Sequence, residues 1–217
     1  MKALAIDSVS ACISIKAVNE KLTAKFSINI GLHQSEAILP AIERVLAEVN
    51  LPISELEFIA LCQGPGSFTG LRLGFAAAKA ISFASNCPIY AIETMDCYAL
   101  PYKSWQGAVV SILDAKKDKF YGAIYHNGKK SSDTLDGEIT EFIKMIDEEE
   151  HALVVGPDGE CFCSMFQETK PNQKISFFAH CDWDCCEQLL FLAQEKYIKK
   201  EPSLASYEGP FYIRNET

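Results

Sequence analysis

The chain has 217 residues, 48% hydrophobic and 23% charged, which is enough for one large or two small globular domains with a buried core. Its formal net charge of −9 argues against a protein that holds nucleic acid by itself, because such proteins need a basic face. The sequence has no apolar run near the ~18 residues of a membrane span and no export signal, so we expect a cytoplasmic protein with no membrane contact and with reduced cysteines.

The first hundred residues predict a mixed sheet flanked by helices. In chain order, the alternation and spacing of apolar residues predict strands at 2–7, 11–18 and 21–30, a helix at 35–49, a strand at 58–63, a helix at 69–84, a strand at 88–92 and a helix at 94–100. Three strands with short connections form an antiparallel meander, and the later strands alternate with helices. The fold class is therefore α/β.

The pattern restarts near residue 103. In chain order, we expect strands at 108–114 and 119–126, a helix at 139–149, a strand at 153–156, a helix after Asp158 and an amphipathic helix at about 184–199. We therefore predict two domains, 1–102 and 103–217. The final helix is a candidate to pack back on the first domain.

The segment Gly64–Gly74, GPGSFTGLRLG, is rich in glycine and leads into a predicted helix. It does not match a phosphate-binding loop of the Walker type, because no lysine follows it, and its glycine spacing differs from GxGxxG. Gly64-Pro65-Gly66 is a turn signal instead, and Ser67 or Thr69 is expected to cap the helix.

The helix after this turn carries a stripe of small side chains. They recur at every fourth position, as Gly70, Gly74, Ala78 and Ser82. Glycine costs up to ~1 kcal/mol relative to alanine in a helix, so the stripe indicates that another backbone comes close. Apart from Arg72 and Lys79 the helix is apolar almost all round, and such a helix needs cover on more than one side. A neighbouring helix of the same domain and a helix of another protein both remain open as the cover.

Cysteine and histidine spacings give no support for a metal or hydrolytic site. Structural zinc sites favour cysteines separated by two to four residues, whereas Cys161 and Cys163 are separated by one, Cys185 and Cys186 are adjacent, and the chain has no CxxC pair to complete a site with Cys181. The chain also contains no HExxH and no GxSxG motif. We therefore predict no catalytic residue, no bound metal and no cofactor.

Five motifs in the right order resemble the TsaB (YeaZ) family. They are AIDSVSACISIKAV, HQSEAILPAIERVL, GPGSFTGLRLGFAAAKAIS, LDAKKDKFYGAIY and GPFYIR. The resemblance covers nearly the whole chain, although residues 128–205 carry little of it. This family supplies the dimerisation subunit of the bacterial complex that makes threonylcarbamoyladenosine, next to the anticodon, in tRNAs that decode ANN codons. The resemblance implies an actin-like ATPase (ribonuclease H-like) fold with two subdomains, each a mixed sheet flanked by helices.

The resemblance also implies that catalysis has been lost. The catalytic relative, TsaD, binds ATP and a metal, the latter through HxxxH, whereas here His33 is followed four residues later by Ala37. Asp7 is followed by Ser8 rather than glycine, and the chain has no Gly-Gly pair. Asp7, Ser8 and Asp114 are kept as the candidate remnant of a nucleotide cleft.

The function implied is that of a non-catalytic scaffold that binds and supports a TsaD-type threonylcarbamoyltransferase. A TsaE-type ATPase is expected to join the complex, tRNA to be contacted only through it, and two copies to pair through the same surface when the partner is absent. The predicted partner interface consists of Ser35, Ile38, Leu39, Ile42, Gly70, Leu71, Gly74, Phe75 and Ala78. A stand-alone actin-like ATPase or kinase is the alternative, and a metallopeptidase-like hydrolase is a weaker one.

Overall fold

The computed structural model describes residues 1–29, 31, 34–147, 150–178 and 184–213. Contacts divide the chain into two compact units. Unit one consists of Met1–Thr94 and Asp184–Phe211, and unit two of Met95–Trp183 and Tyr212–Thr217. Unit one is thus built from both ends of the chain. Among the described helices, none combines the length and the hydropathy that crossing a bilayer requires.

Unit one is centred on a five-stranded mixed sheet. Its strand order is β3-β2-β1-β4-β5. The strands are β1 (Lys2–Asp7), β2 (Cys12–Asn19), β3 (Leu22–Asn29), β4 (Phe58–Gly64) and β5 (Ile89–Glu93). The first three pair antiparallel as a meander, and β4 and β5 run parallel to β1.

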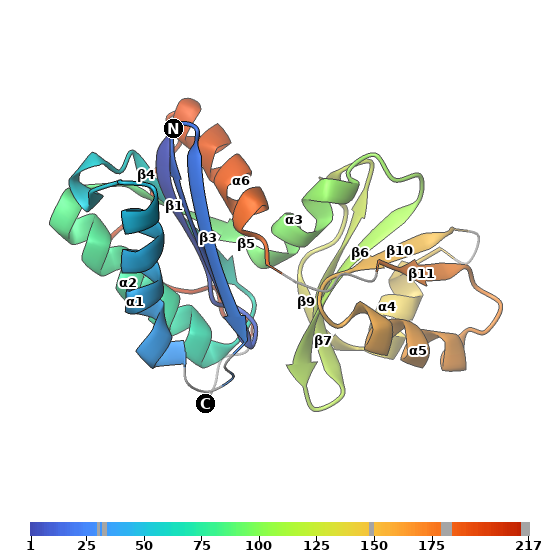
Figure 1. Cartoon of the computed structure of the whole chain (residues 1–217). Coiled ribbons are helices and arrows are strands. Elements are labelled where there is room, and N and C mark those ends of the chain that lie inside the picture. The colour runs from blue at the N-terminus through green and yellow to red at the C-terminus, as the bar shows by residue number, and fades with distance from the viewer. Residues whose placement is uncertain (30, 32–33, 148–149, 179–183, 214–217) are drawn as a thin grey trace. The chain divides into compact units, whose positions relative to one another are not determined.

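Helices cover both faces of this sheet (Figure 1). α1 (Gln34–Glu48) and α2 (Phe68–Ser85) pack on one face, and α6 (Cys186–Ile198) packs on the other, against β1, β4 and β5. Side chains alternate between the faces, so Ile6 and Leu61 join the core under α1 and α2. Phe58 lies on the other side, where its ring contacts Tyr197 of α6 at 5.3 Å between centroids.

Unit two has its own sheet and its own core. The strand order is β11-β10-β6-β7-β8, and β9 also pairs with β7. These strands are β6 (Ala108–Lys116), β7 (Lys119–His126), β8 (Lys129–Lys130), β9 (Leu135–Glu138), β10 (Ala152–Val155) and β11 (Ile175–Phe177). α4 (Ile139–Met145) and α5 (Gly159–Thr169) bury Phe142, Phe162 and Phe166 against it. α3 (Thr94–Ala99) follows β5 in the chain.

The longer predicted elements are confirmed to within one or two residues at most ends. The helix expected at 139–149 is shorter, because α4 ends at Met145; residues 148–149, like Ile30 at the end of a predicted strand, lie outside the described part of the chain. β8, β9 and β11 were not predicted. Each has two to four residues, and β9 contains polar residues and a glycine, so pairing with β7 creates it rather than any local pattern.

Candidate functional site

The turn after β4 fixes where α2 begins. The amide N–H of Ser67 donates to the carbonyl of Val9 at 2.7 Å, which ties the turn to the loop after β1. The Ser67 hydroxyl accepts a hydrogen bond from the amide of Gly70 at 3.2 Å, as an N-cap residue does. The prediction of a turn and a helix cap in this segment is confirmed.

The small stripe of α2 packs on the end of β1 in the same unit. A Cβ at position 70 would lie 1.9 Å from the backbone oxygen of Ser8, and one at position 74 would lie 2.5 Å from its Oγ. That Oγ donates to the carbonyl of Gly70 at 2.8 Å. Ala78 is fully buried. This corrects the interpretation that these small residues make room for another protein, because the backbone that comes close is that of Ser8.

The apolar members of the predicted interface are also mostly internal. Those that belong to the core of unit one are Ile38, Ile42, Leu71 and Phe75. A side chain buried in its own core cannot touch a partner while the fold is intact. Ser35 is exposed, and 53% of Leu39 is exposed, so these two residues of α1 are the members of the predicted set that face outward.

A second line of side chains on α2 points away from the core. We call it the α2 outer face, and it comprises Thr69, Arg72, Ala76, Ala80 and Phe83. Phe83 is 94% exposed. The guanidinium of Arg72 lies 3.7 Å from the ring centre of Phe68. These residues repeat at three- and four-residue spacing, which was visible in the sequence. The two sides of the helix are both apolar, so spacing alone could not tell which one lies on the sheet.

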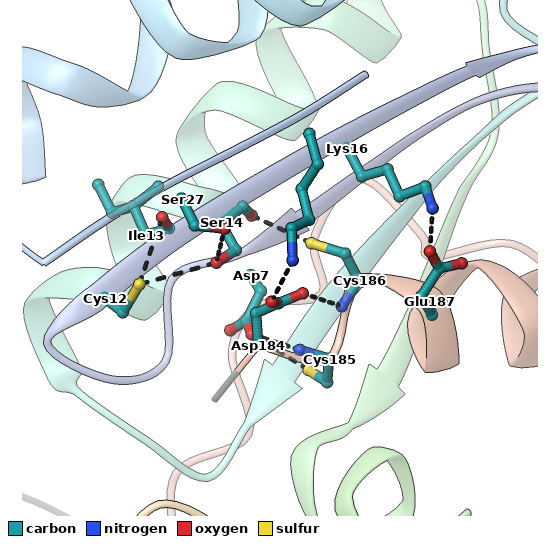
Figure 2. Close-up of polar contacts among 11 residues, drawn as sticks. Asp7, Cys12, Ile13, Ser14, Lys16, Ser27, Asp184, Cys185, Cys186 and Glu187 are labelled. Atoms are coloured by element: carbon teal, nitrogen blue, oxygen red, sulfur yellow. Dashed lines mark hydrogen bonds and ion pairs between the residues drawn. The ribbon is translucent and has the colours of Figure 1, made fainter. Parts of the chain in front are cut away.

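Asp7 lies on the opposite side of the sheet, beneath the start of α6 (Figure 2). It is 3% exposed. Its Oδ1 accepts from the amide of Val9 at 3.3 Å, and its Oδ2 accepts from the amide of Cys185 at 3.1 Å and from the Cys185 thiol at 3.2 Å. Burial, and next the nearby Cys62 thiol, raise the pKa of the Asp7 carboxyl well above its usual range. The carboxyl is therefore held entirely by groups of unit one.

Polar pairs of β2 and β3 extend this cluster (Figure 2). The Lys25 ammonium lies 2.8 Å from the Asp184 carboxylate. Lys16 pairs with Glu187, as Figure 2 shows. The thiol of Cys186 donates to the carbonyl of Ser14 at 3.3 Å. The two ion pairs join the strand meander to Glu187 in the first turn of α6 and to Asp184, two residues before the helix starts.

Asp114 belongs to unit two and has partners there. Its carboxylate oxygens accept from the amide of Lys116 at 2.7 Å and from its ammonium at 2.5 Å. Its own amide donates to the carboxylate of Asp158 at 2.7 Å, and burial raises the pKa of Asp158. Asp7 and Asp114 thus lie in different units, and a cleft that joins them stays a prediction.

The cysteines considered for zinc are divided between the units. Cys161 and Cys163 lie on α5 in unit two, whereas Cys185 and Cys186 open α6 in unit one. Cys181 and His33 lie outside the described residues. None of the eight cysteines that the structure describes forms a disulfide.

Comparison with known proteins gave matches over most of the chain. A family model described as TsaD, tRNA N6-adenosine threonylcarbamoyltransferase, matches residues 30–216. The tRNA threonylcarbamoyladenosine biosynthesis protein TsaB of Bacillus subtilis is 24% identical, with 90% of this chain and 88% of the relative covered. The protein of the same name from Haemophilus influenzae is 26% identical, with 84% and 80% covered.

Solved structures match the fold. YeaZ from Pseudomonas aeruginosa superposes with a TM-score of 0.79 at 22% identity, over 98% of this chain and 99% of that one. A structure of the AlfA filament bound to AMPPNP superposes with a TM-score of 0.50 at 10% identity, over 93% and 100%. The whole chain is therefore built on one established architecture.

Proposed function

The chain belongs to the TsaB (YeaZ) family, within the wider family of TsaD-type tRNA N6-adenosine threonylcarbamoyltransferases, and we propose that it acts in the biosynthesis of threonylcarbamoyladenosine in tRNA. Its fold is that of the actin-like ATPases, with a mixed sheet flanked by helices in unit one. A fold of this kind hosts both enzymes and their non-catalytic relatives, so the role has to be argued from the residues.

The proposed role is that of a non-catalytic scaffold that binds and supports a TsaD-type subunit. Both oxygens of Asp7 accept hydrogen bonds inside unit one, and the Ser8 hydroxyl donates to the backbone of α2. A carboxylate and a hydroxyl engaged in this way are not turned toward a substrate. These hydrogen bonds of Asp7 and Ser8 support the proposal that the chain contributes a binding surface to the complex rather than catalytic groups.

The observation that carries this proposal is the α2 outer face. An almost fully exposed Phe83 stands on a helix whose other outward residues include Ala76 and Ala80, and α1 packs beside α2 with Ser35 and Leu39 exposed. Apolar side chains of this size gain free energy when a partner removes them from water. Small side chains between them let a partner helix approach closely. The buried residues of the predicted interface then support the shape of the surface without touching the partner.

The remaining partners are those that the family resemblance implies. In the absence of the TsaD-type subunit, two copies of this chain pair through it in a two-fold dimer. A TsaE-type ATPase adds to the heterodimer, and tRNA is contacted only through the complex. Because the substrate is tRNA, the proposed place of action is the cytoplasm.

The test uses the TsaD-type subunit of the same organism. The two proteins are mixed and weighed by light scattering after size exclusion, and their affinity is measured by calorimetry. Ala76→Glu places a charge in the centre of the α2 outer face and should weaken binding at least ~100-fold, about 3 kcal/mol, because that charge loses water on binding. Glutamate is a good helix former, so the variant's own unfolding free energy should change by less than ~0.5 kcal/mol.

Gln167→Glu is the matched control. It adds the same charge at an exposed position of α5 in unit two and should leave the affinity unchanged. Equal affinity of Ala76→Glu and the wild type would remove the α2 outer face from the interface. Hydrolysis of ATP by the isolated chain would contradict the non-catalytic role and favour the stand-alone ATPase.

A further inference from the structure

Two cysteines that are distant in sequence meet inside unit one. Cys62 lies near the end of β4, and Cys185 is the residue that precedes α6. Their Sγ atoms are 3.3 Å apart, and both side chains are 1% exposed. The two residues are 123 positions apart in sequence. Side-chain alternation explains the meeting, because Cys62, like Phe58, lies on the face of the sheet that α6 covers.

A proton acceptor stands beside this pair. The Asp7 Oδ2 accepts a hydrogen bond from the Cys185 thiol at 3.2 Å, as Figure 2 shows. The amide of Cys185 donates to the same oxygen at 3.1 Å, which holds the carboxyl in place. Burial raises the pKa of Asp7, so this carboxyl retains a proton more readily than an exposed one. In its ionised form Asp7 can take the thiol proton without leaving its position.

Other thiols of unit one have different neighbours. The Cys186 thiol donates to the carbonyl of Ser14, and the Cys87 thiol to the carbonyl of Pro88 at 3.8 Å. Oxygen neighbours of this kind offer no route to a disulfide. A disulfide between Cys62 and Cys185 needs an S–S distance of about 2.05 Å, so the sulfurs must approach by only about 1.3 Å.

We propose that Cys62 and Cys185 are an oxidation site that a hydroperoxide converts into a disulfide, with Asp7 as the acceptor of the Cys185 proton. The Cys185 thiol gives its proton to Asp7 and the thiolate attacks one oxygen of hydrogen peroxide; the O–O bond breaks, Cys185 becomes a sulfenic acid, and the leaving hydroxide takes the proton back from Asp7 to form water. The Cys62 sulfur then attacks the Cys185 sulfur, the S–O bond breaks, and a second water leaves. The two thiols lose two electrons and two protons, and hydrogen peroxide is reduced to two waters.

The bond would join two segments that control the shape of unit one. Cys62 lies just before the turn that starts α2, and Cys185 starts the helix on the opposite face of the sheet. The disulfide closes a long loop, which lowers the entropy of the unfolded chain. Oxidation therefore stabilises unit one, and this effect needs no partner protein.

The test uses the full chain. It is treated with hydrogen peroxide under native conditions, remaining thiols are blocked with N-ethylmaleimide, and the digest is analysed by mass spectrometry. The expected product is a Cys62–Cys185 linked peptide that dithiothreitol reverses. The melting temperature should rise by roughly 5–15 °C on oxidation. Exposed Cys161 reports that oxidant reached the protein.

Three variants test which cysteines form the disulfide and whether Asp7 accepts the proton. Cys62→Ala should abolish the linked peptide and the rise in melting temperature, whereas Cys87→Ala, which removes another buried thiol of unit one, should keep both. Asp7→Asn cannot take up the proton and should slow disulfide formation at least ten-fold. A wild type in which Cys161 is oxidised while Cys62 and Cys185 stay reduced overturns the proposal, as does a link from Cys62 to any other cysteine. The peptide map of the oxidised wild type shows whether Cys62 and Cys185 are linked, even where a variant does not fold.

Discussion

Ser8 determines which residues are allowed at positions 70 and 74. Its backbone oxygen and its hydroxyl both point at the small stripe of α2. The sequence predicted the stripe and its close approach, because two glycines in one helix need a reason. It could not identify the approaching backbone, since contact between residues 8 and 70 depends on the pairing of β1 with β4 and leaves no local pattern.

Alanine at these two positions should destabilise the chain by different amounts. Gly70→Ala should lower the free energy of unfolding by about 3 kcal/mol, because the new methyl group would overlap a backbone oxygen that cannot rotate away. Gly74→Ala should cost about 1 kcal/mol, because the Ser8 hydroxyl can rotate and alanine favours the helix. Urea unfolding of the purified variants measures both values.

Gly209→Ala is the control for this pair. Nothing lies within 4 Å of a Cβ at that position, so its stability should match the wild type within ~0.5 kcal/mol. Wild-type stability of Gly70→Ala would mean that Ser8 does not approach α2 in solution.

Asp7 should make stability fall as pH rises. Its pKa is raised in the folded state above the unfolded value of about 3.9, so the folded chain binds this proton more tightly. The contribution is fully present below about pH 4 and is lost as pH rises toward the folded pKa, at up to about 1.4 kcal/mol per pH unit. Urea midpoints measured from pH 4 upward should show this slope in the wild type and a clearly smaller one in Asp7→Asn, where the carboxyl of Asp158, whose pKa burial also raises, remains.

The exposed Asp133→Asn is the reference for this measurement. It should keep the wild-type slope, because only a buried carboxyl carries this cost of ionisation. If unfolding stability changes with pH equally steeply in Asp7→Asn and in the wild type, then Asp7 is not the source of the pH dependence.

Among the elements, α2 has two apolar sides that make different contacts. One packs on β1 and β4, and the other is the α2 outer face. The sequence predicted that the helix needs cover on more than one side. It placed the side of α2 that carries Gly70 and Gly74 at the partner interface, because a stripe of small side chains is a more distinctive local pattern than a line of exposed apolar ones. The exposure of Phe83 favours the proposal that the other side meets the partner, and such exposure depends on which strands the helix covers.

A polar side chain of α2 also holds the carboxyl-terminal segment. The Lys79 ammonium donates to the carbonyls of Ser206 at 2.8 Å and Glu208 at 2.5 Å, and the amide of Phe211 donates to Gln63 at 2.8 Å. Lys79→Met should loosen residues 205–211 and speed amide exchange at Phe211 about five-fold, which corresponds to roughly 1 kcal/mol.

Hydrogen exchange followed by mass spectrometry measures this change. Lys199→Met removes an exposed cation that lies 3.9 Å from the carboxylate of Glu195, and it should leave exchange at Phe211 unaltered. Equal exchange in both variants would show that Lys79 does not restrain the segment.

At the scale of the whole molecule, unit one is made from two separated segments of the chain. Local spacing predicted most of the longer helices and strands, because each carries its own alternation. It offered the last helix only as a candidate to pack on the first domain, and it could not predict that α6 covers β1, β4 and β5, because those contacts link distant positions. The amphipathic spacing of the last helix showed only that it needs a surface to cover.

Removal of residues 95–183 should leave a folded unit. Cys185 contacts Cys62, and Cys62 pairs with Ile92 of β5, so Thr94 and Asp184 lie at the same end of the sheet. A short glycine-serine linker between them should therefore be enough. The shortened chain should unfold cooperatively in urea and keep its affinity for the TsaD-type subunit. A transition without cooperativity would show that unit one depends on the removed residues.

The position of α6 also sets an order of events during translation. The strands of unit one and the two helices on one face are made early, but the helix that covers Phe58 and Tyr90 on the other face is made last. Until then a nascent chain on the ribosome keeps one apolar face of its first sheet open to water while the whole of unit two is synthesised. Such a face is a binding site for chaperones. A ribosome stalled before Cys186 should therefore recruit them, and a nascent chain long enough for α6 to have left the exit tunnel should release them.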